Sequence, residues 1–192
     1  RSYQSLVDIA AKFIQMNSNQ LKKNVKALED IDNNQVFIRE YYNDIDQAEK
    51  LWKELERIHN KSINENTSLS VFVLARYNHH LPKNYNEIVN KFYSLKVDFK
   101  SVHASKGLEA DYVILLNLTN QTYGFPSLIE DDPLISMVMP KAEIYPHAEE
   151  RRLFYVALTR AKRGIFLFSK KGYTSNFIIE LFHFPRVSMS KE

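Results

Sequence analysis

The segment LSVFVLAR, residues 69–76, is a continuous apolar run of strand length that ends in an arginine. It lacks the alternation of a strand with one solvated face, so both faces of this strand are expected to be buried. Burial on both faces is typical of a parallel sheet that is covered by helices. The segments at 111–118 (DYVILLNL) and 164–169 (GIFLFS) have the same character, and shorter runs at 36–41 and 97–102 complete a set of predicted strands.

Segments with apolar residues at helical spacing separate these runs. The strongest is expected to follow Asn43 as its N-cap, and two others are expected after Pro82 and near the N-terminus, the last capped by Ser2 or Ser5. The residues expected on the inward faces of these three helices are Leu6, Ile9, Ala10, Phe13, Ile14, Ile45, Ala48, Leu51, Trp52, Leu55, Ile58, Tyr85, Ile88 and Phe92. Further helices are expected from residue 149 onward and near 175–182. This alternation predicts an α/β fold with a mostly parallel sheet and helices on both faces.

The remaining segments are predicted to be connections. Residues 17–34 are rich in Asn and Lys and are interpreted as a loop or a weak helix. After Leu118 a long connection is expected, and it contains Pro126, Pro133 and Pro140. Connections of that length are usually functional or carry minor structure of their own.

The composition fits one domain and excludes several kinds of site. The 192 residues are 44% hydrophobic, which is enough for a substantial core. There is no cysteine, which excludes disulfides and thiolate metal sites. A formal net charge of +3 permits contact with nucleic acid without indicating it. No apolar run approaches the roughly 18 residues of a membrane span, so no contact with a membrane is expected.

Several ligand-binding motifs are missing from the sequence. It contains neither the Gly-x-x-x-x-Gly-Lys-Ser/Thr loop that cradles triphosphates nor a Gly-x-Gly-x-x-Gly turn. The adjacent His79 and His80 have no carboxylate close by in sequence and are interpreted as turn residues, so no metal site is predicted. The chain is not expected to hold a triphosphate by itself.

The segment SVHASKGLEADYVIL, 101–115, places a polar turn between two predicted strands. Turns at the ends of parallel strands are where α/β sheets bind ligands. In this turn His103, Ser105 and Lys106 carry donors that suit phosphates, and Glu109 carries an acceptor that suits a ribose hydroxyl. The residue types alone favour an ordinary solvated turn over a binding site.

The segment EERRLFYVALTRAKRGIFLF, 149–168, joins a charged helix to a strand. Helical spacing puts Arg152 and Arg160 about two turns apart, so both can reach one side. The planar fork of arginine suits a phosphate. The alternative is that Arg160 complements the C-terminal dipole of the helix, a contribution of roughly 0.3–1 kcal/mol. Spacing alone slightly favours this second interpretation.

Taken together, SVHASKGLEADYVILL and EERRLFYVALTRAK resemble motifs V and VI of the UvrD/Rep-like superfamily 1 helicases, in matching order and spacing. The chain is most similar to the helicase IV-like branch, which lacks a large inserted subdomain. The N-terminal RSYQSLVDIAAKFI looks like motif IV and the helix after it. The resemblance implies that residues 1–192 form the second RecA-like motor domain, a fragment of a longer chain. The phosphate-binding loop and the Mg²⁺ ligands would then lie upstream, in the first motor domain.

The resemblance also implies roles for individual residues. Arg160 matches the arginine finger that reaches the γ-phosphate of ATP, and Glu109 matches the glutamate that bonds the ribose. Gly107 would allow a close approach of the backbone. The residues that match the single-stranded DNA contacts of motif V are His103, Ser105 and Lys106.

Other positions are expected to couple these sites. Arg152 and Glu150 match motif VI positions with a structural coupling role. Arg76, after its strand, is either a coupling residue, a DNA contact or an ordinary strand-end arginine. In motif IV the family has Tyr-Arg-Ser, with the arginine on the γ-phosphate, whereas this chain has Tyr3-Gln4-Ser5. Either Arg1 substitutes for that arginine, or the alignment is shifted, or the motor hydrolyses ATP more slowly.

The function implied is that of the C-terminal motor domain of an ATP-dependent, 3′–5′ DNA helicase of the cytoplasm, associated with the bacterial nucleoid and with DNA repair. The expected partners are single-stranded or partly duplex DNA and the N-terminal RecA-like domain of the same chain, and the expected cofactor is ATP with Mg²⁺. The isolated chain is expected to be inactive. Two alternatives remain: a non-catalytic nucleic-acid-binding or interaction domain that kept the fold, and the motor part of a helicase–nuclease.

Overall fold

A six-stranded parallel sheet forms the centre of the molecule, in the strand order β3-β2-β4-β5-β1-β6. The computed structural model describes residues 2–17, 35–129 and 145–189. The strands are β1 (Val36–Tyr41), β2 (Leu69–Ala75), β3 (Leu95–Ser101), β4 (Ala110–Leu118), β5 (Ala161–Lys170) and the short β6 (Val187–Met189). The predicted parallel α/β architecture is confirmed, and β6 is a strand that the sequence did not predict.

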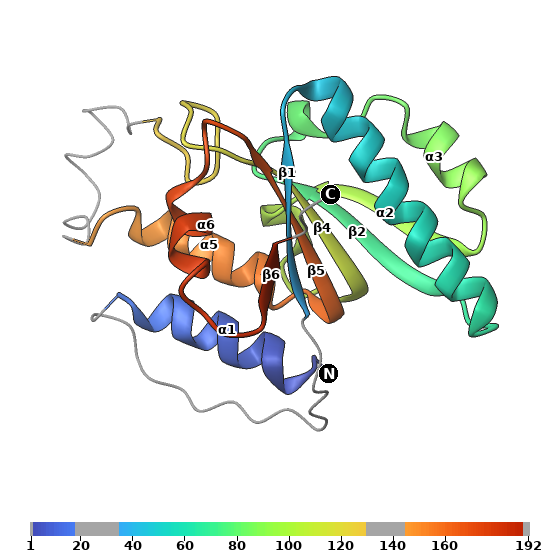
Figure 1. The fold of residues 1–192 in the computed structure, drawn as a ribbon, viewed down its shortest axis with the longest axis horizontal. Coiled ribbons are helices and arrows are strands. Elements are labelled where there is room, and N and C mark those ends of the chain that lie inside the picture. The colour runs from blue at the N-terminus through green and yellow to red at the C-terminus, as the bar shows by residue number, and fades with distance from the viewer. Residues whose placement is uncertain (1, 18–34, 130–144, 190–192) are drawn as a thin grey trace.

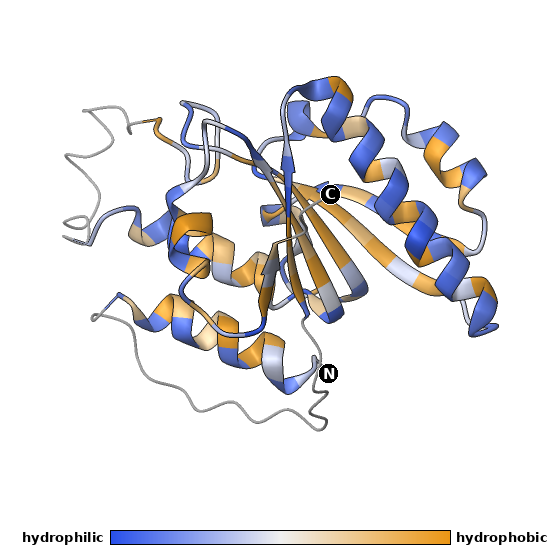
Figure 2. Ribbon diagram, in the orientation of Figure 1, coloured by the Kyte–Doolittle hydropathy of each residue, from blue (hydrophilic) through white to orange (hydrophobic). Residues whose placement is uncertain are grey.

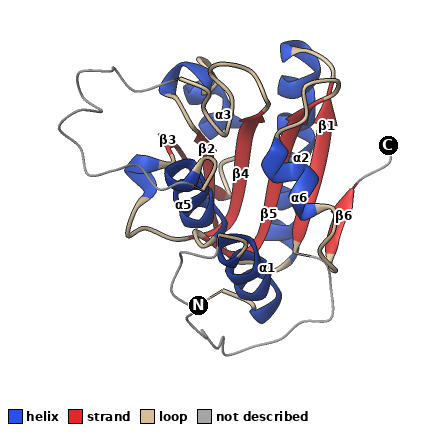
Figure 3. Ribbon diagram, turned by 90° about the vertical axis from the view of Figure 1, so that its left-hand side faces the viewer, coloured by secondary structure: helices blue, strands red, loops and turns tan. Residues whose placement is uncertain are grey.

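Helices cover both faces of this sheet, as Figures 1 and 3 show. One face is packed by α1 (Gln4–Gln15), α5 (Ala148–Leu158) and α6 (Asn176–Leu181), and the other by α2 (Asp44–Asn64) and α3 (Tyr85–Lys91). Two short 3₁₀ turns, η1 (Asn78–His80) and η2 (His103–Ser105), follow strands β2 and β3. The central strands are apolar along most of their length (Figure 2), as expected for strands buried on both faces.

The helix faces follow the prediction with specific exceptions. Asn43 caps α2 as predicted, accepting a hydrogen bond from the Asp46 amide at 3.0 Å. Ile45 is 73% exposed and Ala48 is also exposed, because the buried stripe of α2 runs instead through Leu51, Glu54, Leu55, Ile58 and Ser62. Glu54 is inward because it forms a buried ion pair with Arg39.

Two smaller predictions about helices are wrong. The N-cap of α1 is Tyr3 rather than Ser2 or Ser5, because Ser2 donates to the Ala161 carbonyl and Ser5 lies buried within the helix. Tyr85 is 51% exposed, because α3 is short and Ile88 is its only buried residue.

Some predictions fall outside the described residues. These are the loop or weak helix within 18–34 and the part of the long connection that contains Pro133 and Pro140. In the ranges that are described, no helix is long and apolar enough to cross a membrane.

The connection between β3 and β4 determines where several of the predicted site residues lie. Ser101 at the end of β3 pairs with Ala75, whereas Ala110 at the start of β4 pairs with Ala161 at the start of β5. Because β3 and β4 are parallel, residues 102–109 must run back along the length of the sheet. We call them the crossing segment. Buried Val102 belongs to the same core as α1 and α5, so this segment crosses on that face.

Candidate nucleotide and nucleic-acid site

The crossing segment exposes only part of the predicted DNA-contacting set. His103 and Lys106 are exposed, whereas Ser105 has no exposed surface. The Ser105 hydroxyl donates to the Val102 carbonyl at 2.6 Å, since the turn η2 folds this side chain inward. The hydroxyl therefore does not face the surface on which we expected it to contact DNA.

The second half of the crossing segment turns at Gly107. Gly107 has φ +81°, which a glycine adopts without strain, and a Cβ at this position would meet no atom within 4 Å. The chain then continues through the exposed Leu108 and Glu109 into β4. The backbone is thus accessible at the predicted point of close approach.

Arg160 joins the end of α5 to the crossing segment. Its Nε donates to the Val156 carbonyl at 3.0 Å, and its Nη2 donates to the Thr159 hydroxyl at 3.2 Å. Its Nη1 donates to the Leu108 carbonyl at 2.8 Å, and its own carbonyl accepts from the Ala110 amide at 3.0 Å. Arg160 therefore does bind a carbonyl of the last turn of α5, as the helix-end interpretation predicted. One further N–H remains on each Nη atom, because each carries two.

Glu109 and Lys162 lie beside this arginine at the starts of β4 and β5. Their charged groups are 3.5 Å apart and both side chains are well exposed. The start of α1 reaches the same place, since Ser2 donates to the Ala161 carbonyl at 2.6 Å and the Tyr3 amide donates to the Lys162 carbonyl at 3.0 Å. The structure thus brings motifs IV, V and VI together at the amino-terminal edge of the sheet.

Gln4 is part of this edge, but its amide is directed along its own helix. Its Nε2 donates to Asp8 Oδ1 at 2.6 Å. Arg1 lies outside the described residues. The predicted contact of position 4 with a nucleotide stays a prediction.

Two of the remaining predicted residues, Arg76 and Glu150, lie at the opposite, carboxyl edge of the sheet. Arg76 and Glu150 form a two-point ion pair, with Arg76 Nη2 2.8 Å and Arg76 Nε 2.9 Å from Glu150 Oε1. The other carboxylate oxygen accepts from the Ser127 amide at 2.9 Å. This network joins the end of β2, the first turn of α5 and the loop after β4. Arg152, by contrast, makes an exposed pair with Glu149 at 3.1 Å on the same helix.

His103 lies near this network. Partial burial of the ring lowers the pKa of His103, and the positive charges of Arg76 and Lys106 lower it further. At neutral pH the ring is therefore mainly uncharged, and it can donate or accept a hydrogen bond without adding a positive charge.

One structural residue in the same stretch was missed by the sequence reasoning. Arg151 is buried, and its guanidinium binds Glu180 through two hydrogen bonds of 2.7 and 2.8 Å while lying 4.5 Å from the centre of the Phe13 ring. It holds α5, α6 and α1 together. The signal was available, because Arg151 lies three and seven residues before the inward Phe154 and Leu158.

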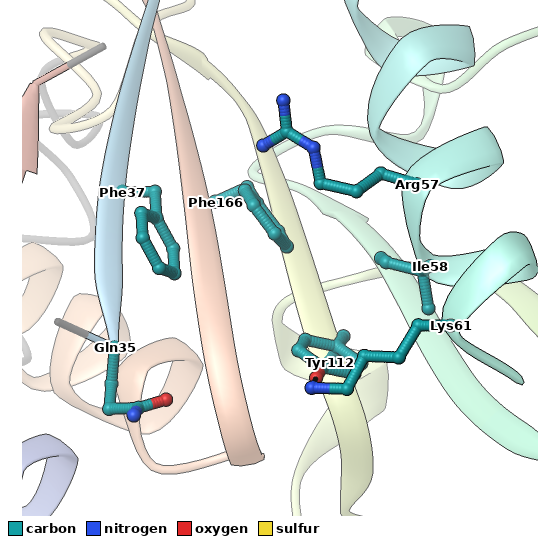
Figure 4. A pocket seen from close by; sticks show the side chains of 7 residues that line it. All are labelled: Gln35, Phe37, Arg57, Ile58, Lys61, Tyr112 and Phe166. Atoms are coloured by element: carbon teal, nitrogen blue, oxygen red, sulfur yellow. Dashed lines mark hydrogen bonds between the residues drawn. The ribbon is translucent and has the colours of Figure 1, made fainter. Parts of the chain in front are cut away.

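A separate pocket of about 480 Å³ lies between α2 and the sheet (Figure 4). It is lined by Gln35, Phe37, Arg57, Ile58, Lys61, Tyr112 and Phe166. Lys61 Nζ donates to the Tyr112 hydroxyl at 2.8 Å, and this bond is the main reason that the pKa of Lys61 is raised. None of the site residues predicted from the sequence lines this pocket.

His79 and His80 form the turn η1, in agreement with their interpretation as turn residues. Within the described ranges, no group of three His, Cys, Asp or Glu side chains is placed to hold a metal ion.

Comparison with known proteins shows which proteins this chain is similar to. Residues 83–172 match the UvrD-like helicase C-terminal domain. The chain is 34% identical to DNA helicase IV of Escherichia coli K12 over 171 residues, which cover 89% of this chain and 24% of that protein. It is 41% identical to a probable DNA helicase II homolog of Mycoplasma capricolum over 83 residues, covering 43% of this chain and 10% of that one. The chain thus spans about a quarter or less of these relatives.

A solved structure shows the same fold. It is the C-terminal domain of a possible DNA helicase from Lactobacillus plantarum WCFS1, with a TM-score of 0.57 and 16% identity. The match covers 98% of this chain and 97% of that chain.

Proposed function

Because this chain contains a UvrD-like helicase C-terminal domain, related to that of DNA helicase IV, we propose that it is the second motor domain of an ATP-dependent, 3′–5′ DNA helicase or translocase. The 34% identity to DNA helicase IV confirms the predicted resemblance to the helicase IV-like branch. One observation carries the proposal for its mechanism. The crossing segment and α5 both run between the two edges of the sheet. The crossing segment has Glu109 at the amino-terminal edge and His103 at the carboxyl edge. The helix α5 has Arg160 just after its end at the amino-terminal edge and Glu150 in its first turn at the carboxyl edge.

The amino-terminal edge is the proposed nucleotide side. Arg160 keeps N–H groups for a phosphate, Glu109 presents an exposed carboxylate for a ribose hydroxyl, and the backbone at Gly107 is open. These residues fit the ribose and the terminal phosphate of ATP held by a second domain. A guanidinium that meets the γ-phosphate stabilises the charge of phosphoryl transfer, an effect of roughly 10³–10⁵ in rate. Mg²⁺ and the other phosphate ligands would come from the first motor domain.

The carboxyl edge is the proposed DNA side. Lys106 supplies a positive charge and His103 a neutral hydrogen-bonding group, both exposed near the ends of β2 and β3. Contacts of this kind bind the phosphate backbone, are sensitive to salt and do not read sequence. Ser105 takes no direct part, and its buried hydroxyl holds the turn that presents His103.

The Arg160–Leu108 hydrogen bond links the two sides. When the guanidinium turns toward a phosphate across the interdomain cleft, it exchanges the Leu108 carbonyl for a phosphate oxygen. The crossing segment then loses one of its anchors at the amino-terminal edge, while the Arg76–Glu150–Ser127 network still holds the carboxyl edge. ATP binding would in this way change the freedom of the segment that carries His103 and Lys106.

The test is the Arg160→Ala variant in the complete protein. We expect the loss of DNA-stimulated ATP hydrolysis, with binding of a fluorescent ATP analogue largely retained. Lys91→Ala, which removes an exposed charge from the last turn of α3 on the opposite face of the sheet, is the control and should keep most of the activity. Hydrolysis that survives Arg160→Ala would reject the finger assignment. If the complete wild-type protein does not hydrolyse ATP, the non-catalytic alternative is favoured.

A further inference from the structure

Aromatic side chains gather at the carboxyl edge of the sheet, beside the proposed DNA contacts. Tyr77 and His79 follow β2, and Tyr123 comes from the loop after β4. Tyr77 and His79 are stacked, with ring centres 5.4 Å apart and planes 17° from parallel. Tyr123 stands nearly perpendicular to both, at 5.8 Å from Tyr77 and 5.7 Å from His79. We call these three residues the aromatic cluster.

The aromatic cluster is not part of either hydrophobic core. None of its members belongs to the two core clusters, Tyr123 is 54% exposed and His79 is also exposed. Tyr77 is half-buried and His79 also contacts the half-buried His80 ring at 4.2 Å, but the exposed rings of His79 and Tyr123 are not accounted for by core burial. Their arrangement therefore points to a function at the surface.

The cluster is held in place on its inner side. The Tyr77 hydroxyl is 2.7 Å from the Ser127 hydroxyl, and the Arg76 guanidinium lies 4.7 Å from the centre of the Tyr77 ring. Arg76 and Ser127 are themselves fixed by Glu150. Tyr77 is thus the anchored member, and the exposed rings are those of His79 and Tyr123.

Exposed rings next to positive charges are what single-stranded nucleic acid binds. Nucleobases stack on aromatic faces regardless of sequence, while cations hold the adjacent phosphates. The Val102 amide donates to the Ala75 carbonyl at 2.9 Å, so His103 and Arg76 continue from neighbouring points and the cluster adjoins the crossing segment. Two imidazoles at 79 and 80 would suggest a metal, but among the described residues they have no third ligand.

We propose that Tyr123 and His79 form a stacking platform for the bases of single-stranded DNA, whose phosphates contact Lys106 and His103. A base that stacks on one of these rings meets the other ring at its edge, because the two planes are 82° apart. The inference rests on the proposed DNA side of this domain and adds to it the residues that contact the bases.

The experiment compares two ligands that differ only in their bases. Fluorescence anisotropy at low salt measures binding of the 192-residue chain to labelled oligothymidine and to an oligonucleotide of equal length made of abasic sites. We expect the wild-type chain to bind oligothymidine more tightly. Tyr123→Ala should weaken that binding roughly 5- to 100-fold and leave the abasic ligand unaffected. Tyr123→Trp should keep the preference, because it keeps a ring.

Two further variants make the outcomes distinct. Lys106→Ala should weaken both ligands alike, and Tyr93→Ala, which removes a 77% exposed tyrosine at the far end of α3, should change neither. If the wild-type chain binds both ligands equally and Tyr123→Ala changes nothing, stacking is rejected while the phosphate contacts stand. Stacking is also rejected if Tyr123→Ala weakens the binding of both ligands equally. If the wild-type chain binds neither ligand, the DNA side itself is rejected.

Discussion

The guanidinium of Arg160 donates a hydrogen bond to the backbone carbonyl of Leu108 at 2.8 Å, although 52 positions separate the two residues. The bond ties the residue proposed as the arginine finger to the segment that carries the proposed DNA contacts. It also means that Arg160 has a structural role in the resting domain. Any loss of activity in an Arg160 variant has to be separated from a loss of stability.

Replacement of Arg160 by alanine should therefore lower the stability modestly. The substitution removes three hydrogen bonds from a partly exposed guanidinium, and we expect the free energy of unfolding to fall by about 1 kcal/mol. Urea unfolding followed by circular dichroism measures this. A fall of this size leaves the domain folded, so it cannot account for a thousand-fold loss of hydrolysis. A loss large enough to unfold the domain would remove the basis for interpreting the activity.

The Arg76–Glu150 pair should be a substantial energetic link. The pair is mostly buried and has two-point geometry, so a double-mutant cycle with Arg76→Ala and Glu150→Ala should give a coupling energy of about 1–3 kcal/mol. Arg152 and Glu149 on the same helix provide the matched control, because their pair is exposed. Their cycle should give less than about 0.5 kcal/mol. Equal coupling energies in the two cycles would show that the Arg76–Glu150 pair contributes no more to stability than an exposed pair.

How much of this site was predictable depends on the distance between partners. The sequence predicted a coupling role for Glu150 and offered one for Arg76 among other interpretations, but the two residues lie 74 positions apart. Their pairing depends on α5 beginning beside the end of β2, which no local pattern reveals. Arg160 and Glu109 were singled out by the order and spacing of their motifs rather than by residue type, and their roles stay predictions.

The predictions that failed involve competition between local patterns and packing. Ser105 has the residue type of a phosphate ligand, yet the turn η2 gives its hydroxyl a backbone acceptor 2.6 Å away. Ile45 and Ala48 were assigned to the inner face of α2 by helical spacing alone, yet both are exposed. The buried stripe includes Glu54 instead, because its ion pair with Arg39 makes the burial of this carboxylate favourable.

Two histidines should make the stability depend on pH. Burial, together with the charge of His79, lowers the pKa of His80, and the pKa of His103 is lowered as described above. The unfolded chain therefore binds protons more readily than the folded chain at these positions. The stability is fully present above the ordinary histidine pKa of about 6.5 and is lost as the pH falls below it.

The measurement is a series of urea unfolding curves between neutral and mildly acidic pH. We expect His80→Gln and His103→Gln each to flatten the decline below pH of about 6.5, and the double variant to flatten it most. The control is His183→Gln, which removes a histidine from the turn after α6. A slope that is the same in the wild type and the double variant would show that other groups cause the dependence.

Two adjacent arginines in the EERR sequence should behave very differently. Arg151 is buried against Phe13 and bound to Glu180 at two points, whereas Arg152 forms an exposed pair with Glu149 on the helix surface. Arg151→Ala leaves the Glu180 carboxylate without its partner and removes the packing between α1, α5 and α6. We expect the free energy of unfolding to fall by about 3 kcal/mol, against about 0.5 kcal/mol or less for Arg152→Ala. Arg151→Met, which restores apolar volume beside the Phe13 ring, should recover part of the loss if packing contributes to it. If Arg151→Ala and Arg152→Ala prove equally mild in urea unfolding, Arg151 does not hold the three helices together.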